Sequence, residues 1–133
     1  MAEMITLSTH RAFIICSGYG TFLFNSVPFS VKTGDLIIGL QGETFKVQPA
    51  EDLEYLYIGF EGSQASAIFS RFGICFQNRF FSRFGEFIPL WKESLSMACE
   101  RNLDLAAEGI LLYTFSRLDK LSAKSQGDRK SVV

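Results

Sequence analysis

Residues 34–62, GDLIIGLQGETFKVQPAEDLEYLYIGFEG, alternate short apolar runs with tight-turn signals, and this alternation constrains the fold most. Glycine tolerates the positive φ of tight turns, and each apolar run has the length of a β-strand. Short strands that follow one another at such intervals are typical of a sandwich or a small barrel. We therefore predict a β-sandwich or β-barrel for this part of the chain.

The same pattern extends back to residue 11. Strands are predicted at 11–16, 21–25, 29–32, 36–40, 45–48 and 53–60, and a last strand at 78–82. Residues 17–20 (SGYG) are predicted to form a turn, because glycine punctuates strands. Residues 49–52 (PAED) are predicted to interrupt strand pairing, because proline has no N–H to donate.

After the strands, the apolar period becomes helical. Residues 63–72 can form one or two helical turns, and residues 85–101 carry apolar side chains at i, i+3 and i+4 spacing. Pro89 must lie in the first turn of that helix, since a deeper position costs about 3 kcal/mol. A second helix is predicted from Leu103 to about residue 122, with Asn102 as its N-cap. This organisation divides the chain into a barrel (1–84), a helical pair (85–122) and a polar linker or tail (123–133).

The second predicted helix is apolar on more than one face. One stripe at heptad-like spacing comprises Ala107, Leu111, Thr114, Leu118 and Leu121. A helix that packs on a single barrel needs only one apolar stripe, so a second apolar face indicates a second burial partner. We predict that this stripe forms a homodimer interface. The alternative is a helix wedged between the barrel and the first helix, with no partner.

Charge and composition argue against direct nucleic-acid binding by this chain. The net charge is −1, with acidic and basic residues interspersed, whereas nucleic-acid-binding domains usually carry a basic face. Arg71, Arg79 and Arg83 are the nearest approach to a basic patch. Solvated loop arginines are the preferred interpretation of this trio, and a phosphate-binding patch is the alternative.

The chain has few residues suited to catalysis or metal binding. Its three cysteines, Cys16, Cys75 and Cys99, are far apart, and His10 is its only histidine. We expect reduced thiols in a cytoplasmic protein, with no metal, no cofactor, no catalytic residue and no enzymatic activity. No apolar run approaches the ~20 residues of a membrane span, and residues 1–10 do not resemble a signal peptide.

Three segments together carry a resemblance to a known family: GYGTFLF, VKTGDLIIGLQGETFKV and LEYLYIGFEG. In this order they are similar to the sensor domain of AraC-type bacterial transcription regulators. The resemblance implies a mainly β fold with some α, a cupin-like (double-stranded β-helix or jelly-roll) barrel followed by two antiparallel helices. It also implies a small-molecule effector, often a sugar, inside the barrel, and dimerisation through the helices. DNA binding is then expected only from helix-turn-helix domains beyond Val133.

Two departures from relatives of this fold bear on the ligand. Metal-binding cupins hold their ion through histidines and a carboxylate, but Phe45 and Gly59 stand where such ligands often occur. The pocket is predicted from Phe13, Phe45, Tyr55, Tyr57 and Gly59. An aromatic lining of this kind favours an apolar or aromatic effector over a hydroxylated sugar, although the same aromatics can simply fill a small barrel. The alternative function is a freestanding cupin-like enzyme or a carbohydrate-binding protein.

Overall fold

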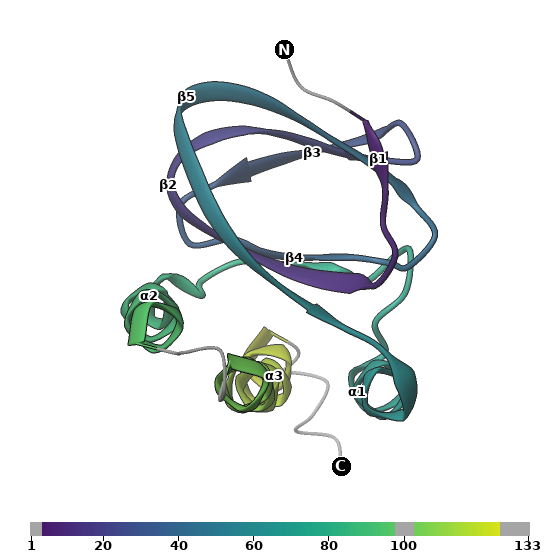
Figure 1. The fold of residues 1–133 in the computed structure, drawn as a ribbon, viewed down its shortest axis with the longest axis vertical. Coiled ribbons are helices and arrows are strands. Elements are labelled where there is room, and N and C mark those ends of the chain that lie inside the picture. The colour runs from purple at the N-terminus through teal and green to yellow at the C-terminus, as the bar shows by residue number, and fades with distance from the viewer. Residues whose placement is uncertain (1–3, 98–102, 126–133) are drawn as a thin grey trace.

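The computed structural model describes the backbone of residues 4–97 and 103–125. One antiparallel sheet curls into a barrel, and helices pack on a single side of it (Figure 1). The strands are β1 (Ile5–Thr6), β2 (His10–Phe24), β3 (Val27–Lys32), β4 (Leu36–Gly39), β5 (Thr44–Phe60) and β6 (Phe80–Phe81). The helices are α1 (Gly62–Phe72), the short 3₁₀ helix η1 (Gly85–Phe87), α2 (Ile88–Met97) and α3 (Leu103–Ser125). The predicted fold class, a mainly β cupin-like barrel with helices, is confirmed.

Two long strands form the centre of the sheet. β2 pairs antiparallel with β5 from His10 opposite Phe60 to Phe24 opposite Phe45. The first half of β2 also pairs with β4, and its second half pairs with β3. Because each long strand bends along its length, its two halves belong to opposite walls of the barrel (Figure 1).

The predicted turn at 17–20 is wrong, because this segment lies inside the continuous strand β2. Residues 49–52 lie inside β5, and the pairing with β2 is irregular there, as predicted. The pairing of β2 with β5 slips between Ile15 and Gly20, as it does at β-bulges. Gly18 adopts φ +74° at this bulge, and a Cβ there would lie 2.0 Å from the Glu51 carbonyl oxygen. The glycine and proline signals therefore mark a bend in a strand pair and not its end.

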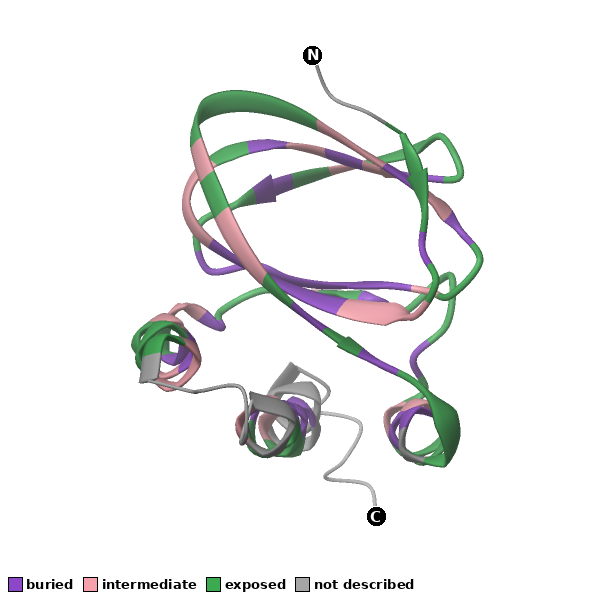
Figure 2. Ribbon diagram, viewed as in Figure 1, coloured by how far each residue is buried: buried purple, intermediate pink, exposed green. Residues whose placement is uncertain are grey.

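Alternation along the strands separates two apolar clusters. Side chains on the concave face form the barrel core, which comprises Leu7, Phe13, Ile15, Phe22, Phe24, Val31, Ile37 and Phe45. Side chains on the other face, among them Ala12, Ile14 and Ile58, pack against the helices. In Figure 2, long buried stretches lie on the wall of the barrel that faces the helices.

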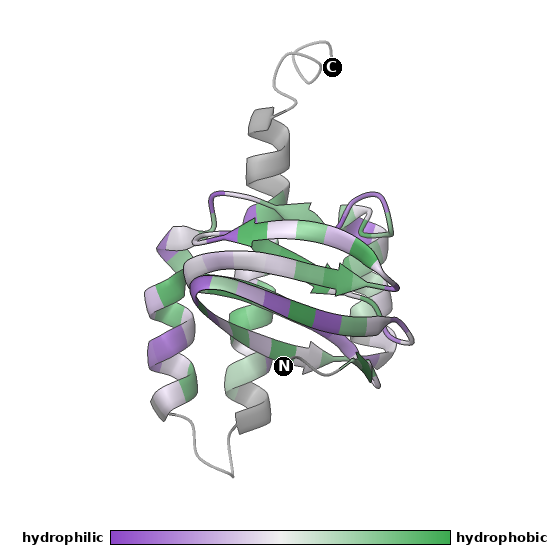
Figure 3. Ribbon diagram, turned by 90° about the horizontal axis from the view of Figure 1, so that it is seen from above, coloured by the Kyte–Doolittle hydropathy of each residue, from purple (hydrophilic) through white to green (hydrophobic). Residues whose placement is uncertain are grey.

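The helical layer covers one wall of the barrel. α1 is longer than the expected one or two turns, and it ends at Gly73, which adopts a left-handed conformation with φ +65°. Pro89 lies in the first turn of α2, as predicted. α2 and α3 lie side by side and run in opposite directions (Figure 3), and the buried Trp91 of α2 contacts α3.

Candidate functional site

Aromatic side chains fill the interior of the barrel. The ring of Phe13 is completely buried, and its centroid lies 4.8 Å from that of Phe45, 5.1 Å from that of Phe22 and 5.8 Å from that of Tyr55. Three of the five residues predicted for the pocket, Phe13, Phe45 and Tyr55, are thus brought together. Phe13 and Phe45, however, form packed core, as the alternative of a filled barrel describes.

The remaining predicted pocket residues, Tyr57 and Gly59, are exposed to solvent. Tyr57 is 47% exposed although its ring centroid lies only 5.7 Å from that of Phe13. Gly59 is exposed, and Tyr55 is half-buried. Burial raises the pKa of the Tyr55 hydroxyl, and the neighbouring Tyr57 acts in the same direction while Arg11 opposes it.

A cleft of about 890 Å³ lies at the bulge of β2. It is lined by Gly18, Tyr19, Gly20, Thr21, Ser30, Val31, Lys32, Thr33, Asp35, Ala50 and Phe80. A cleft of this size accommodates a small organic molecule, since ligand pockets span about 300–1,000 Å³. The sequence around residues 17–20 and 33–35 predicted only turns, because no residue type in the lining of the cleft is specific to a ligand.

The turn between β3 and β4 connects this cleft to the helices. The buried Asp35 carboxylate accepts a hydrogen bond of 2.9 Å from the Lys32 N–H, which closes the turn. Between the cleft residues Thr33 and Asp35, the Gly34 carbonyl accepts a hydrogen bond of 2.8 Å from the N–H of Phe84. Phe84 is fully buried and directly precedes η1 and α2. This hydrogen bond links the turn directly to the residue that precedes the helical pair.

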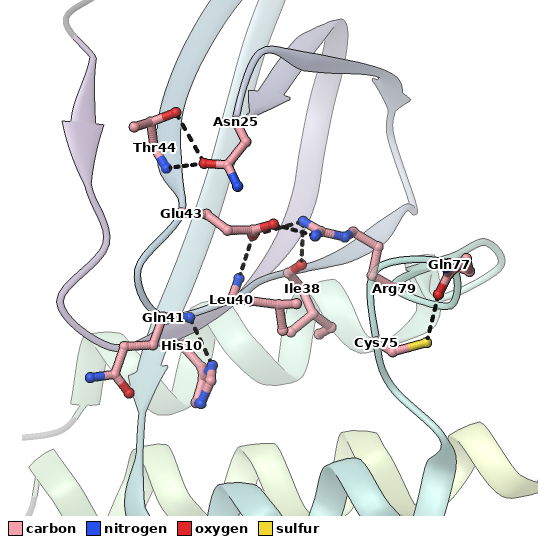
Figure 4. A network of polar contacts seen from close by, with 10 residues as sticks. All are labelled: His10, Asn25, Ile38, Leu40, Gln41, Glu43, Thr44, Cys75, Gln77 and Arg79. Carbon is pink, nitrogen blue, oxygen red and sulfur yellow. Dashed lines mark hydrogen bonds and ion pairs between the residues drawn. The ribbon is translucent and has the colours of Figure 1, made fainter.

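A buried ion pair between Glu43 and Arg79 was not predicted (Figure 4). The Glu43 carboxylate accepts hydrogen bonds from both terminal nitrogens of Arg79, one of them 2.9 Å long, and from the Leu40 N–H at 2.8 Å. The guanidinium also lies 4.9 Å from the centroid of the Phe24 ring. The interpretation of Arg79 as a solvated loop arginine is therefore wrong, because its side chain is only 3% exposed and forms an ion pair with Glu43.

The stripe predicted for the dimer interface faces the barrel of its own chain. Leu111, Thr114 and Leu118 are buried against the core, and Ala107 is half-buried beside them. The side chain of Leu121 lies outside the described part of the structure. This placement matches the wedged alternative for these residues.

Other apolar side chains of α3 are exposed instead. Leu112 is 47% exposed and Tyr113 is 51% exposed. Leu112 borders a groove of about 350 Å³ between α1 and α3, which is also lined by Ala67, Ile68, Arg71, Phe72, Phe115 and Ser116.

The residues suited to metal or redox chemistry are dispersed. Within residues 4–97 and 103–125, no three His, Cys, Asp or Glu side chains gather closely enough to hold a metal ion. Cys16 is half-buried and Cys75 is exposed, whereas Cys99 lies outside the described residues. Among the described residues, no helix is both long and apolar enough to cross a membrane.

The curled antiparallel barrel, its aromatic core and its one-sided helical layer define a cupin-like barrel. The model of one family matches residues 12–108, which is most of the chain. The chain belongs to this family, the AraC-like ligand binding domain.

Solved structures resemble this chain at low sequence identity. ToxT from Vibrio cholerae, in an apo form, matches with a TM-score of 0.59 and 10% identity, covering 96% of this chain and 56% of that one. The plu4264 protein from Photorhabdus luminescens matches with a TM-score of 0.43 and 18% identity over 56% of this chain and 64% of that one. PAC13 from Streptomyces, solved with uridine, has a TM-score of 0.38 and 19% identity, with coverages of 47% and 52%. The chain thus spans less than two-thirds of each of these proteins, and no curated protein sequence matches it.

Proposed function

We propose that this chain is the effector-binding and dimerisation domain of a bacterial cytoplasmic AraC-type transcriptional regulator. The barrel within residues 1–84 senses the effector, and the helices within 85–122 dimerise. The domain acts by binding and not by catalysis, and it passes ligand occupancy to helix-turn-helix domains. The family match over residues 12–108 is the observation that carries this proposal.

The effector binds in the cleft at the β2 bulge. The buried aromatics Phe13 and Phe45 leave the barrel centre filled, so a ligand has to use an opening. The cleft offers the rings of Tyr19 and Phe80 together with the hydroxyl-bearing Thr21 and Ser30. Apolar walls with a few polar groups suit a small apolar or aromatic effector.

Occupancy of the cleft reaches the helices through Gly34. A ligand that contacts Thr33 or Asp35 biases the position of the turn, and the Gly34 carbonyl holds the Phe84 N–H. A ligand shifts a conformational equilibrium only by the difference in its affinity for the two states. The turn can give the ligand different affinities for two conformations, because it lines the cleft and is also bonded to the residue before η1.

The homodimer uses the exposed face of α3 and not the buried stripe. Leu112 and Tyr113 present apolar surface there, and the adjoining groove against α1 can accept side chains of a second copy. Leu111, Thr114 and Leu118, which were predicted for the interface, lie on the opposite side of α3 and pack it onto the barrel.

Two matched substitutions test the effector site and the interface separately. Ala50→Trp fills the cleft, whereas Ala67→Trp places the same bulk in the groove between α1 and α3. Native mass spectrometry of the unmodified chain should give about twice 14.9 kDa with a small adduct that leaves on activation. Ala50→Trp should abolish the adduct and keep the dimer, and Ala67→Trp should weaken the dimer and keep the adduct. A monomer without an adduct under all conditions would contradict both assignments.

A further inference from the structure

The last part of β5 is an open edge of the sheet. β5 lies between β1 and β2 in the strand order, but β1 pairs only with Thr44 and Phe45. From Tyr55 to Phe60, β5 pairs with β2 on one side and, within residues 4–97 and 103–125, with no strand on its other side. We call residues 55–60 the open edge. Such an edge presents backbone N–H and C=O groups that another extended chain can bind.

The hydrogen bonds of β2 determine which residues of β5 face outwards. The Ile15 N–H donates a hydrogen bond of 2.9 Å to the Asp35 carbonyl, so the backbone groups of Ile15 point away from β5. Tyr55, directly opposite Ile15, therefore forms a non-hydrogen-bonded pair with it. Because hydrogen-bonded and non-hydrogen-bonded pairs alternate along an antiparallel ladder, the N–H and C=O groups of Tyr55, Tyr57 and Gly59 point to the open edge.

The other edges of the sheet are short or blocked. β1 and β6 have two residues each. β3 contains Pro28, which has no N–H, and the N–H of its Lys32 is bonded to the Asp35 carboxylate. Proteins protect sheet edges with short strands, prolines and lysines, but residues 55–60 (YLYIGF) contain no proline and no charged side chain. This edge is therefore available for pairing.

The charges around the open edge indicate what kind of chain it can accept. Exposed acidic side chains stand at both of its ends, Glu51, Asp52 and Glu54 before it and Glu61 after it. Arg11 is the cation near its middle, 4.2 Å from the centroid of the Tyr57 ring. Two copies paired antiparallel here would bring the acidic start of one edge against the acidic end of the other, which is unfavourable. An extended segment with basic residues at its two ends has complementary charge.

We propose that the open edge binds an extended basic segment of another protein by strand addition. Backbone hydrogen bonds to Tyr55, Tyr57 and Gly59 hold the segment, while the acidic ends of the edge select lysine or arginine. Thr9 covers Gly59 on the concave face, where an added Cβ would lie 2.9 Å from the Thr9 hydroxyl oxygen. The segment therefore adds beside β5, in the plane of the sheet, and does not enter the barrel.

The probe is the peptide Lys-Val-Thr-Val-Thr-Val-Lys. Its two matched controls are the same peptide with every internal amide nitrogen methylated and the same peptide with glutamate in place of both lysines. We expect amide hydrogen exchange, followed by NMR, to be fast at Tyr55, Tyr57 and Gly59 in the free chain and slow at Leu56 and Ile58. Saturating lysine peptide should slow exchange at the outward-facing amides about tenfold or more, because they gain hydrogen-bond partners. Neither control peptide should do so.

Tyr57→Pro and Tyr57→Ala are the matched protein variants. Both remove the ring, but only proline removes the N–H that faces the open edge, and an edge strand tolerates proline at such a position. We expect Tyr57→Ala to keep binding the lysine peptide and Tyr57→Pro to weaken the binding about tenfold or more. If Tyr57→Pro does not fold, the methylated peptide decides the question on the wild-type chain.

Several results would overturn the proposal. Exchange at Tyr57 as slow as at Ile58 in the free chain would show that the edge is already covered. Failure of the lysine peptide to bind, or equal binding of the methylated peptide, would exclude strand addition. Equal affinity for the glutamate peptide would exclude a basic partner. Exchange that slows with protein concentration alone would assign the edge to a second copy of the chain.

Discussion

The indole N–H of Trp91 donates a hydrogen bond of 3.0 Å to the hydroxyl of Thr114, and both side chains are completely buried. This bond joins α2 to α3 beneath the barrel. Thr114→Val keeps the shape of the side chain but leaves the indole N–H without an acceptor, which costs about 1–3 kcal/mol. Urea denaturation should show this loss in the free energy of unfolding, and Thr114→Ser should restore most of it. An unchanged free energy of unfolding in Thr114→Val would mean that this hydrogen bond does not stabilise the protein.

Removing one partner of the Glu43–Arg79 pair should lower the stability of the protein more than removing both partners. Arg79→Met leaves the Glu43 carboxylate buried without its cation, and breaking a buried pair in this way costs about 3–5 kcal/mol. The double variant Glu43→Leu/Arg79→Met removes both charges and should recover much of the stability. Thermal and denaturant unfolding of the two single variants and the double variant measure the coupling. Additive effects would show that the two side chains do not act as a pair.

Gly18 and Gly42 offer a matched comparison of steric and conformational cost. Both adopt positive φ, but a Cβ at Gly18 would overlap the backbone of Glu51, whereas a Cβ at Gly42 meets nothing within 4 Å. We expect Gly42→Ala to cost about 1–3 kcal/mol from backbone strain alone. Gly18→Ala should cost more than that, because the β2–β5 pairing must shift as well. If Gly18→Ala and Gly42→Ala lowered the unfolding free energy equally, close packing of Gly18 against Glu51 would be contradicted.

His10 should make stability depend on pH. Partial burial lowers its pKa below 6.5, although the carboxylates of Glu61 and Glu43 act in the opposite direction, and its Nδ1 accepts a hydrogen bond of 2.9 Å from the Gln41 N–H. Below pH 6.5 the unfolded chain therefore binds more protons at this residue than the folded chain does. The contribution is complete above pH 6.5 and is lost as the pH falls through the lowered folded-state pKa.

Because His10 is the only histidine, a single variant tests this expectation. Denaturation of the wild type between pH 7.5 and about 5.5 should show falling stability, and His10→Gln should flatten the profile near its upper end. The same slope in both proteins would assign the effect to carboxylates.

The sequence predicts the strands and the second helix well where the pattern is local. The alternation of Tyr55, Tyr57 and Gly59 against Leu56, Ile58 and Phe60 places each set on the expected face. The turn before β4 and the first-turn position of Pro89 also follow from local chemistry. Such features depend on φ preferences and on side-chain period, which neighbouring residues determine.

Features that depend on distant partners could not be predicted in this way. The continuity of β2 through Gly18 depends on how Glu51 packs across the bulge, and the charge on Arg79 is buried only because Glu43, 36 residues away, meets it. The orientation of the Leu111 and Leu118 stripe was ambiguous for the same reason. The sequence of an apolar helix face does not show whether that face packs on its own barrel or on a partner subunit. The packing of the helices on one barrel wall determines the orientation of this stripe.

The end-to-end pairing of β2 with β5 has a consequence for how the chain folds. The contact between Phe24 and Phe45 closes the shortest loop of that pairing, and the contact between His10 and Phe60 closes the longest. Loop-closure entropy grows with the length of chain enclosed, so the ladder forms most readily from the Phe24 end and zips towards His10. Since α2 and α3 pack on the wall that includes this last-formed half, native helix docking is a late event on the folding pathway, and the rate at which the molecule becomes competent to function depends on non-local strand pairing.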